Sequence, residues 1–284
     1  MTPLGGGAAL EAPAKLNRWL AVVGRRPDGF HELDSELVLL ELADRLTVAS
    51  GRGLRVSGGG AGMPRGRTNL AWRGLALGLG VSRPPHRLHL DKLIPVSAGL
   101  GGGSSDGAAA WRLGRWLATG VDAAADVADL GRLADLGADI PFFAARLSAG
   151  RIRGRGETVE PAVGLSADTH VVLVQPPFGL STAAVFAELR PADWRASGGA
   201  GAGLEPGRND LLAPAMRLRP EIGEVFRLVL AAGAQPYLSG SGPTVFVLTD
   251  DPERAGRMAQ RLGRGGLRTS RTRIRGEPAS ILPQ

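Results

Sequence analysis

The chain has 284 residues, of which 43% are hydrophobic and 21% charged, a composition typical of a soluble globular protein with one or two domains. It contains no cysteine, which excludes disulfides, thiolate catalysis and zinc sites built on cysteine. The formal net charge of +7 raises the question of nucleic-acid binding, but the arginines are scattered and aromatic residues make up only 5%, which leaves few surfaces for base stacking.

The first thirteen residues, MTPLGGGAALEAP, lack a basic segment that leads into an apolar core, and no run of about 18 apolar residues follows. We therefore expect a cytoplasmic protein with no membrane partner. An anionic small-molecule substrate explains the positive net charge at least as well as nucleic acid does. We do not expect nucleic acid as a partner.

Lysine is rare in this chain, because only two of the 34 basic residues are lysines, Lys15 and Lys92. A compact, rotatable ammonium is not equivalent to a planar guanidinium, so the two lysines are candidates for special roles. Residues 14–23, AKLNRWLAVV, predict a strand with Lys15 and Asn17 on one face. This strand would place a cation beside an amide. The alternative is an edge strand with a solvated lysine.

The next stretch, RRPDG at 25–29, predicts a turn, and Phe30 and His31 follow it directly. An aromatic residue and a histidine after a turn suit a platform for base stacking, although a lone histidine is more often structural. The elements that we expect next are a strand at 37–48, a glycine-rich hairpin or loop at 51–67, a helix at 70–79 capped by 68–70, and a strand at 87–93.

Residues 95–110, PVSAGLGGGSSDGAAA, form the most informative stretch. Its glycines can adopt positive φ and let several backbone N–H groups face one anion. Residues 104–106 are candidates for the cap of a following helix, whose unpaired N–H groups also favour phosphate. The alternative is a merely flexible loop, but the strand pattern before it and the helix pattern after it favour a phosphate cradle. No P-loop and no complete G-x-G-x-x-G is present.

A second helix is expected from Asp122 or Asp126 to Leu136, and it is followed by Gly137 as its stop. Its expected buried stripe is Val127, Leu130, Leu133 and Ala134. Asp139 then precedes the proline-stiffened apolar run IPFF. A carboxylate in such surroundings, with an ammonium nearby, suits a general base, whereas the alternative is that Asp139 caps a turn.

The rest of the chain alternates between strand and helix patterns, which favours a small open sheet with helices on one face. The expected elements are a hairpin at 151–160, a domain boundary near 161–168, a strand at 170–175, a loop or helix at 181–189, a low-complexity loop at 197–207, a helix at 220–232, a glycine-serine turn at 237–243, a strand at 244–248, a helix at 252–262 and a strand at 268–274.

Three stretches, AKLN at 14–17, the glycine-serine cradle and YLSGSG at 237–242, resemble the three motifs of the GHMP kinases, a family named for galactose, homoserine, mevalonate and phosphomevalonate. APAKLN, RRPDGFHEL at 25–33, IPVSAGLGGGSSD, GADIPFF and RGRGE at 153–157 further resemble the branch that phosphorylates cytidine diphosphate methylerythritol in the non-mevalonate isoprenoid pathway. The likeness covers most of the chain, with the motifs in the family's order.

The resemblance implies an α+β, two-domain GHMP kinase fold. Residues 1–163 would form an ATP-binding domain like ribosomal protein S5 domain 2, and residues 164–284 a ferredoxin-like domain, with the active site between them. It also implies an ATP-dependent kinase that uses Mg²⁺ and phosphorylates the 2-hydroxyl of a small-molecule substrate, cytidine diphosphate methylerythritol.

The resemblance also implies roles for single residues. Asp139 would be the base that takes the hydroxyl proton, and Lys15 its partner. The ATP phosphates would be held by Pro95, Val96, Ser97, Ala98, Gly99, Leu100, Gly101, Gly102, Gly103, Ser104 and Ser105. The cytidine end of the substrate would be surrounded by Asn17, Phe30, His31 and Phe186. Ser104 or Ser105 could contact Mg²⁺, but no dedicated metal ligands are identified.

Three positions depart from the usual pattern of that branch. Phe30 replaces a tyrosine, so stacking is kept and a hydroxyl hydrogen bond is lost. Gly107 loosens the start of the helix, and Phe186 lies in a weakly matching stretch. The rival functions are another GHMP kinase acting on homoserine or mevalonate, a basic nucleic-acid-binding module, and a silent relative, which the presence of both Lys15 and Asp139 disfavours.

Overall fold

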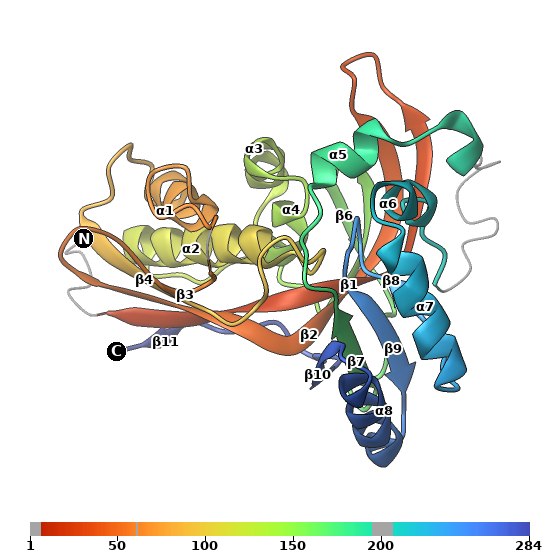
Figure 1. The fold of residues 1–284 in the computed structure, drawn as a ribbon. Helices are drawn as coiled ribbons and strands as arrows, with labels where there is room; N and C mark the ends of the chain where they lie inside the picture. Colours follow the sequence, from red (N-terminus) through yellow and green to blue (C-terminus); the bar gives the residue numbers. More distant parts are fainter. Residues whose placement is uncertain (1–6, 61, 195–206) are drawn as a thin grey trace.

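The computed structural model describes residues 7–60, 62–194 and 207–284, which form two sheets and the helices that cover them (Figure 1). The seven-stranded sheet contains β1 (Ala8–Arg25), β2 (His31–Ser50), β3 (Gly53–Gly58), β4 (His86–Lys92), β5 (Ala149–Gly154), β6 (Thr158–Pro161) and β11 (Leu282–Pro283). The four-stranded sheet contains β7 (His170–Gln175), β8 (Tyr237–Leu238), β9 (Val245–Thr249) and β10 (Arg268–Arg273).

The helices are α1 (Leu70–Leu79), α2 (Gly102–Thr119), α3 (Val127–Leu136), α4 (Ile140–Ala144), α5 (Thr182–Ala187), α6 (Leu212–Leu218), α7 (Glu221–Ala231) and α8 (Pro252–Arg264), with a short 3-10 helix at Pro191–Asp193. Figure 1 shows α1 to α4 on one side of the larger sheet, whereas α7 and α8 lie beside the smaller one. The expected α+β class is confirmed. The strands expected at 170–175, 244–248 and 268–274 form a small open sheet, whereas those of the hairpin at 151–160 belong to the larger sheet.

The long hairpin of β1 and β2 is the frame of the molecule, and the expected turn at 25–29 joins its two strands. The register shifts between Pro13 and Lys15 and again between Asn17 and Trp19. Such irregularities bend a strand and re-aim its side chains. At the first one, the backbone N–H of Lys15 donates to the carbonyl oxygen of Leu100 over 2.9 Å, so β1 is tied directly to the glycine cradle.

Several expected elements are confirmed together with their local causes. Asn69 caps α1, because its side-chain oxygen accepts a 2.8 Å hydrogen bond from the N–H of Ala71. Helix α7 buries Ile222, Val225 and Val229 against the smaller sheet, as the 3.6-residue period predicts.

Other expectations were wrong. Residues 51–67 contain β3, which pairs in parallel with β4, rather than only a hairpin or loop. Helix α2 begins behind Gly101 at φ 71°, so residues 104–106 lie inside its first turns and do not cap it. Val127, expected to be buried, is 87% exposed at the first residue of α3, and the buried residues of this helix are Asp129 and Leu133.

Gly107 has a packing role that the sequence did not reveal. Helices α1 and α2 lie side by side, and a Cβ added at Gly74 would come within 2.1 Å of the carbonyl oxygen of Gly107. A Cβ added at Gly107 itself would lie 3.1 Å from Cδ1 of Ile140. Glycine therefore lets α2 approach both α1 and α4.

The expected low-complexity loop at 197–207 lies outside the described residues except for its last position. The domain boundary near 163 stays a prediction, although β11, from the far end of the chain, pairs with β1 in the larger sheet. Among the described residues, no helix combines the length and apolar character needed to cross a bilayer.

Candidate active site

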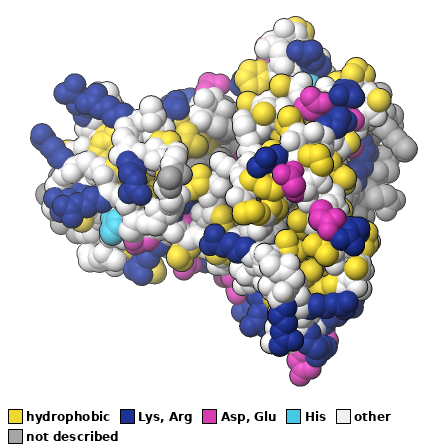
Figure 2. Space-filling model, in the orientation of Figure 1, with side chains coloured by type: hydrophobic (Ala, Val, Ile, Leu, Met, Phe, Trp, Pro, Cys, Tyr) yellow, Lys and Arg dark blue, Asp and Glu magenta, His cyan; other side chains and the backbone are white. Residues whose placement is uncertain are grey.

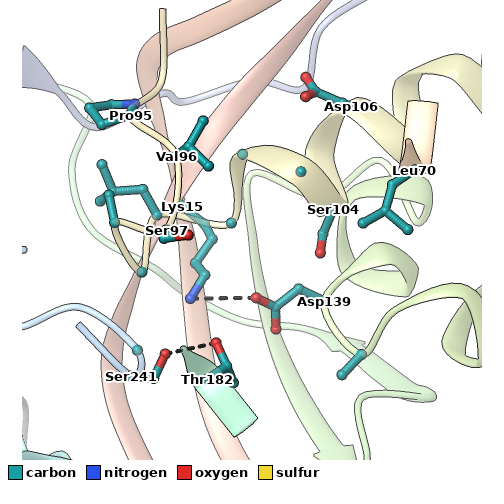
Figure 3. Close-up of a pocket in the computed structure, with 18 of the residues that line it drawn as sticks. Lys15, Leu70, Pro95, Val96, Ser97, Ser104, Asp106, Asp139, Thr182 and Ser241 are labelled. Carbon is teal, nitrogen blue, oxygen red and sulfur yellow. Dashed lines mark hydrogen bonds and ion pairs between the residues drawn. The ribbon is translucent and has the colours of Figure 1, made fainter. Parts of the chain in front are cut away.

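A cavity of about 510 Å³ lies where the glycine cradle, β1, the start of α4, α5 and the turn after β8 meet (Figure 3). Its wall includes every residue from Pro95 to Ser104. Lys15, Asn17, Asp139 and Phe186 also line it. The structure thus brings together most of the site residues expected from the sequence.

Lys15 and Asp139 face each other in this cavity, with 3.5 Å between Nζ of Lys15 and Oδ2 of Asp139 (Figure 3). The Lys15 residue is 3% exposed, so the alternative of a solvated lysine is wrong. Asp139 occupies the N-cap position of α4, but its side chain makes no cap hydrogen bond. Its carboxylate, 30% exposed, is therefore directed to the ammonium and the cavity.

A chain of buried hydrogen bonds orients the ammonium of Lys15. Its Nζ donates to Oδ1 of Asn17 over 2.7 Å, and Nδ2 of Asn17 donates to the hydroxyl of Ser35 over 2.8 Å. The Ser35 hydroxyl then donates to the carbonyl oxygen of Trp19 over 2.6 Å. The expected pairing of a cation with an amide is confirmed. Ser35 had no signal in the sequence, because its contact with Asn17 depends on the register of β1 and β2, in which Ser35 pairs with Leu20.

The cradle is shaped by residues with positive φ, namely Ser97 at 54°, Gly99 at 78° and Gly101 at 71°. A Cβ added at Gly101 would lie 2.8 Å from Cγ of Lys15, so glycine here makes room for the lysine stem. Helix α2 starts at once behind this turn. The N–H groups of its first turn lack intrahelical acceptors and carry the positive end of the helix dipole, an arrangement that attracts anions.

The turn that contains YLSGSG closes the cavity on the side of the smaller sheet. Gly240 has φ 55°, and a Cβ added there would lie 3.0 Å from Nζ of Lys15. The hydroxyls of Thr182 and Ser241 are 3.0 Å apart at the cavity wall (Figure 3). Asn209 fixes this turn, because its Nδ2 donates to the carbonyl oxygens of Leu238 and Gly240 over 3.0 and 2.7 Å. The sequence indicated neither Thr182 nor Asn209 as part of the site.

The aromatic residues expected around the cytidine are only partly gathered. The rings of His31 and Phe186 are stacked with centroids 5.4 Å apart, and Trp194 meets the His31 ring edge-on at 5.5 Å. Burial, with a smaller contribution from Arg25, lowers the pKa of His31. Phe30 lies apart from this cluster, because it is 56% exposed and sits under the Arg155 guanidinium at 5.2 Å.

The two serines of the cradle point in different directions. Figure 3 shows the Ser104 hydroxyl on the same side as the Asp139 carboxylate. Ser105 is buried and borders a second, small cavity beside Arg112. Its side chain is therefore not placed at the main cavity, and its expected role in ATP binding stays a prediction.

Known protein families match the chain in two segments. Residues 69–146 match the N-terminal domain of the GHMP kinases, and residues 197–266 match the C-terminal part of the GHMP kinases. A homoserine kinase from Cytophaga hutchinsonii shares the fold, with a TM-score of 0.68 at 17% identity over 99% of both chains. The two sheets, the glycine cradle and these matches define a GHMP kinase.

The chain is more similar to one branch of this superfamily. It is 39% identical to 4-diphosphocytidyl-2-C-methyl-D-erythritol kinase of Pelotomaculum thermopropionicum, over 89% of this chain and 93% of that protein. The corresponding enzyme of Granulibacter bethesdensis is 40% identical over 90% and 91%. A crystal structure of 4-(cytidine 5'-diphospho)-2C-methyl-D-erythritol kinase superposes with a TM-score of 0.73 at 36% identity, over 94% of this chain and 99% of that one. The chain belongs to the family of 4-diphosphocytidyl-2-C-methyl-D-erythritol kinases.

Proposed function

We propose that the chain transfers the γ-phosphoryl group of ATP to the 2-hydroxyl of 4-(cytidine 5'-diphospho)-2-C-methyl-D-erythritol, a step of non-mevalonate isoprenoid precursor synthesis in the cytoplasm. The observation that carries this proposal is the contact of Lys15 with Asp139 in the cavity lined by the glycine cradle. The names of the relatives indicate the substrate.

To catalyse phosphoryl transfer, a protein mainly has to align the reacting groups and neutralise the charge on the phosphoryl group. In the proposed mechanism, the turn at residues 95–104 and the start of α2 hold the phosphates of ATP. Asp139 accepts the proton of the attacking hydroxyl at its carboxylate. Lys15, held by Asn17, keeps this carboxylate in place and offsets the negative charge that develops on the transferred group.

The site fits a magnesium ion that binds together with the phosphates of ATP. Among the described residues, no cluster of three or more histidine, cysteine or acidic side chains could hold a metal ion. Mg²⁺ usually keeps several waters and is bound by one or two carboxylates together with substrate phosphates, so no such cluster is needed. The oxygens that line the cavity include the Asp139 carboxylate and the Ser104 hydroxyl, either of which could contact the ion. When bound, the ion would neutralise phosphate charge.

The cytidine end of the substrate is assigned to the side of the cavity lined by Asn17 and Phe186. The stacked rings of His31 and Phe186 offer a flat apolar surface for a base. We place Phe30 outside direct contact with the base, since it is exposed and one face of its ring lies under the Arg155 guanidinium.

Two rival functions predict different ligands. A homoserine or mevalonate kinase has no need for an aromatic platform, and CMP would not compete with its substrate. A nucleic-acid-binding protein needs a continuous basic face. Figure 2 instead shows Lys and Arg side chains scattered over the visible face, with acidic side chains among them.

The decisive experiment measures ATP turnover with the cytidine diphosphate methylerythritol substrate, homoserine and mevalonate in parallel. We expect turnover with the first substrate alone, and inhibition by CMP that competes with it. Turnover with homoserine or mevalonate instead, or tight salt-sensitive RNA binding without ATP consumption, would overturn the proposal.

A further inference from the structure

The second lysine of the chain lies in a buried cluster of charges beside the cradle. Lys92 ends β4, Asp44 lies in β2 and Asp106 lies near the start of α2. All three side chains are almost completely buried. Figure 3 shows Asp106 set apart from the pair of Lys15 and Asp139, although Lys92 and Asp106 line the edge of the same cavity. We refer to Lys92, Asp44 and Asp106 as the Lys92 clamp.

The bonds of the clamp join three separate parts of the chain. Nζ of Lys92 donates to Oδ2 of Asp44 and, over 2.8 Å, to Oδ2 of Asp106. The other oxygen of Asp44 accepts hydrogen bonds from the N–H groups of Leu93 and Ile94, over 2.6 and 2.8 Å. The two residues that lead into the cradle are thus held by the same carboxylate that holds the lysine.

The packing around Gly102 shows how closely the clamp borders the phosphate-binding turn. A Cβ added at Gly102, the first residue of α2, would lie 2.9 Å from Cγ2 of Ile94 and 3.2 Å from Nζ of Lys92. The amino terminus of α2 therefore rests directly on the clamp. A displacement of Lys92 would move this terminus relative to residues 95–101.

Burial of three charged groups has a large desolvation cost, so the clamp is a poor means of stabilising the fold. Two carboxylates and one ammonium are buried together, and burial raises the pKa of Asp106 well above its ordinary value. Replacing a buried ionic network by apolar side chains is often neutral or stabilising. A role in fixing the geometry of the adjacent turn gives a reason for keeping these charges.

We propose that the Lys92 clamp positions the phosphate-binding turn against the amino terminus of α2, so that the N–H groups of both are already arranged when ATP arrives. Lys92, Asp44 and Asp106 are positioning residues in this scheme and need not touch the reacting atoms. The inference rests on the proposed function to the extent that residues 95–104 are taken as the ATP phosphate site.

The test compares Asp44→Asn with the wild type. An asparagine has a single side-chain oxygen, so it cannot accept from both the two backbone N–H groups and the ammonium. Affinity for a non-hydrolysable ATP analogue is measured by calorimetry, and KM for each substrate and kcat by steady-state kinetics. We expect ATP binding to weaken about tenfold or more, because small displacements in a preorganised site have large effects, while KM for the cytidine-bearing substrate stays within about twofold.

A matched control is available on the same helix. Arg112 in α2 is buried and makes a two-bonded ion pair with Asp122, over 3.0 and 2.7 Å, away from the main cavity. Asp122→Asn should lower Tm in a similar way and leave the affinity for the ATP analogue unchanged. Equal weakening of ATP binding in both variants would reduce the clamp to a structural element and overturn the proposal.

Lys92→Arg provides a second variant in case Asp44→Asn does not fold. It keeps the charge, but a planar guanidinium does not reproduce a compact ammonium held between two carboxylates beside Gly102. We expect the same selective loss of ATP affinity, and wild-type affinity in a folded Lys92→Arg protein would contradict the clamp. If the wild type binds the ATP analogue but does not phosphorylate the cytidine substrate, the proposed function fails while this comparison still tests the clamp.

Discussion

The hydroxyl of Ser239 donates a hydrogen bond to the carbonyl oxygen of Gly99 over 2.9 Å, and this bond joins two motifs that lie 140 positions apart in the chain. Ser239 is completely buried, so the bond is shielded from water. The glycine cradle is thereby fixed to the turn that closes the other side of the cavity. The shape of the phosphate site depends on both halves of the chain.

Gly99→Ala should destabilise the protein through this junction. Gly99 has φ 78°, and a Cβ added there would lie 2.3 Å from the carbonyl oxygen of Ser239. We expect the free energy of unfolding in urea to fall by about 2 to 4 kcal/mol, from backbone strain plus the clash. Gly29→Ala is the control, because Gly29 also has positive φ but an added Cβ would meet nothing within 4 Å. A loss as large at Gly29 would show that strain alone is responsible.

Asp139→Asn should remove the proposed base while keeping the shape of the site. We expect kcat to fall by about a hundredfold or more, the range found for general-base catalysis, with KM for both substrates little changed. Single-turnover and steady-state assays measure this directly. An unchanged kcat would rule out Asp139 as the base.

Lys15→Arg tests whether a compact ammonium is needed. The stem of Lys15 passes close to Gly101, and its Nζ close to Gly240, so a guanidinium has little space there. We expect kcat to fall at least about tenfold, because an arginine cannot hold the Asp139 carboxylate in the same position. Full activity of the arginine variant would contradict this argument.

Phe186→Ala and Phe30→Ala should have unequal effects. Phe186 lines the cavity and stacks on His31, whereas Phe30 is exposed under Arg155. Removing a base-stacking ring has an effect of about 1–3 kcal/mol, so we expect KM for the cytidine-bearing substrate to rise roughly tenfold for Phe186→Ala. KM for ATP serves as the internal control. A larger effect for Phe30→Ala would place the base at the hairpin tip instead.

Asp106 should make stability depend on pH. Burial raises its pKa in the folded state above the ordinary value of 3.8, so the folded protein keeps a proton that the unfolded chain has released. Its contribution to stability is therefore present at pH below 3.8 and is lost as the pH rises through the folded-state pKa. Asp106→Asn should reduce this decline, as measured by urea unfolding at several pH values. An identical pH profile in the variant would show that Asp106 does not titrate in this way.

Much of the site could be predicted from the sequence where a local pattern carries the chemistry. The period of two in β1 places Lys15 beside Asn17, and the glycine-rich turn before a helix indicates an anion site. The meeting of Lys15 with Asp139 followed from the family resemblance, since no local rule relates residues so far apart in the chain.

The parts that could not be predicted depend on contacts between distant segments. Ser35 contacts Asn17 because of the register of β1 and β2. Asn209 donates to the carbonyl oxygen of Gly240, which lies 31 positions further along the chain. Local rules also misplaced the start of α2, because Gly101 can begin the helix without a side-chain cap. A Cβ at Gly101 would also meet the stem of Lys15, a contact that the sequence does not show.

Strand β1 packs into three separate hydrophobic clusters. Leu10 lies in a cluster with Leu46 and Leu88, and Leu16 in one with Leu40 and Ile94. Leu20 lies in a third, with Val172 and Val245 of the smaller sheet. Strand β1 thus runs as one continuous element through both halves of the molecule. Closure of the two halves around a nucleotide by a hinge motion would require β1 to bend at its centre. We therefore expect the enzyme to stay nearly rigid during its reaction, without domain closure. Its radius of gyration in solution scattering should be the same with and without its ligands.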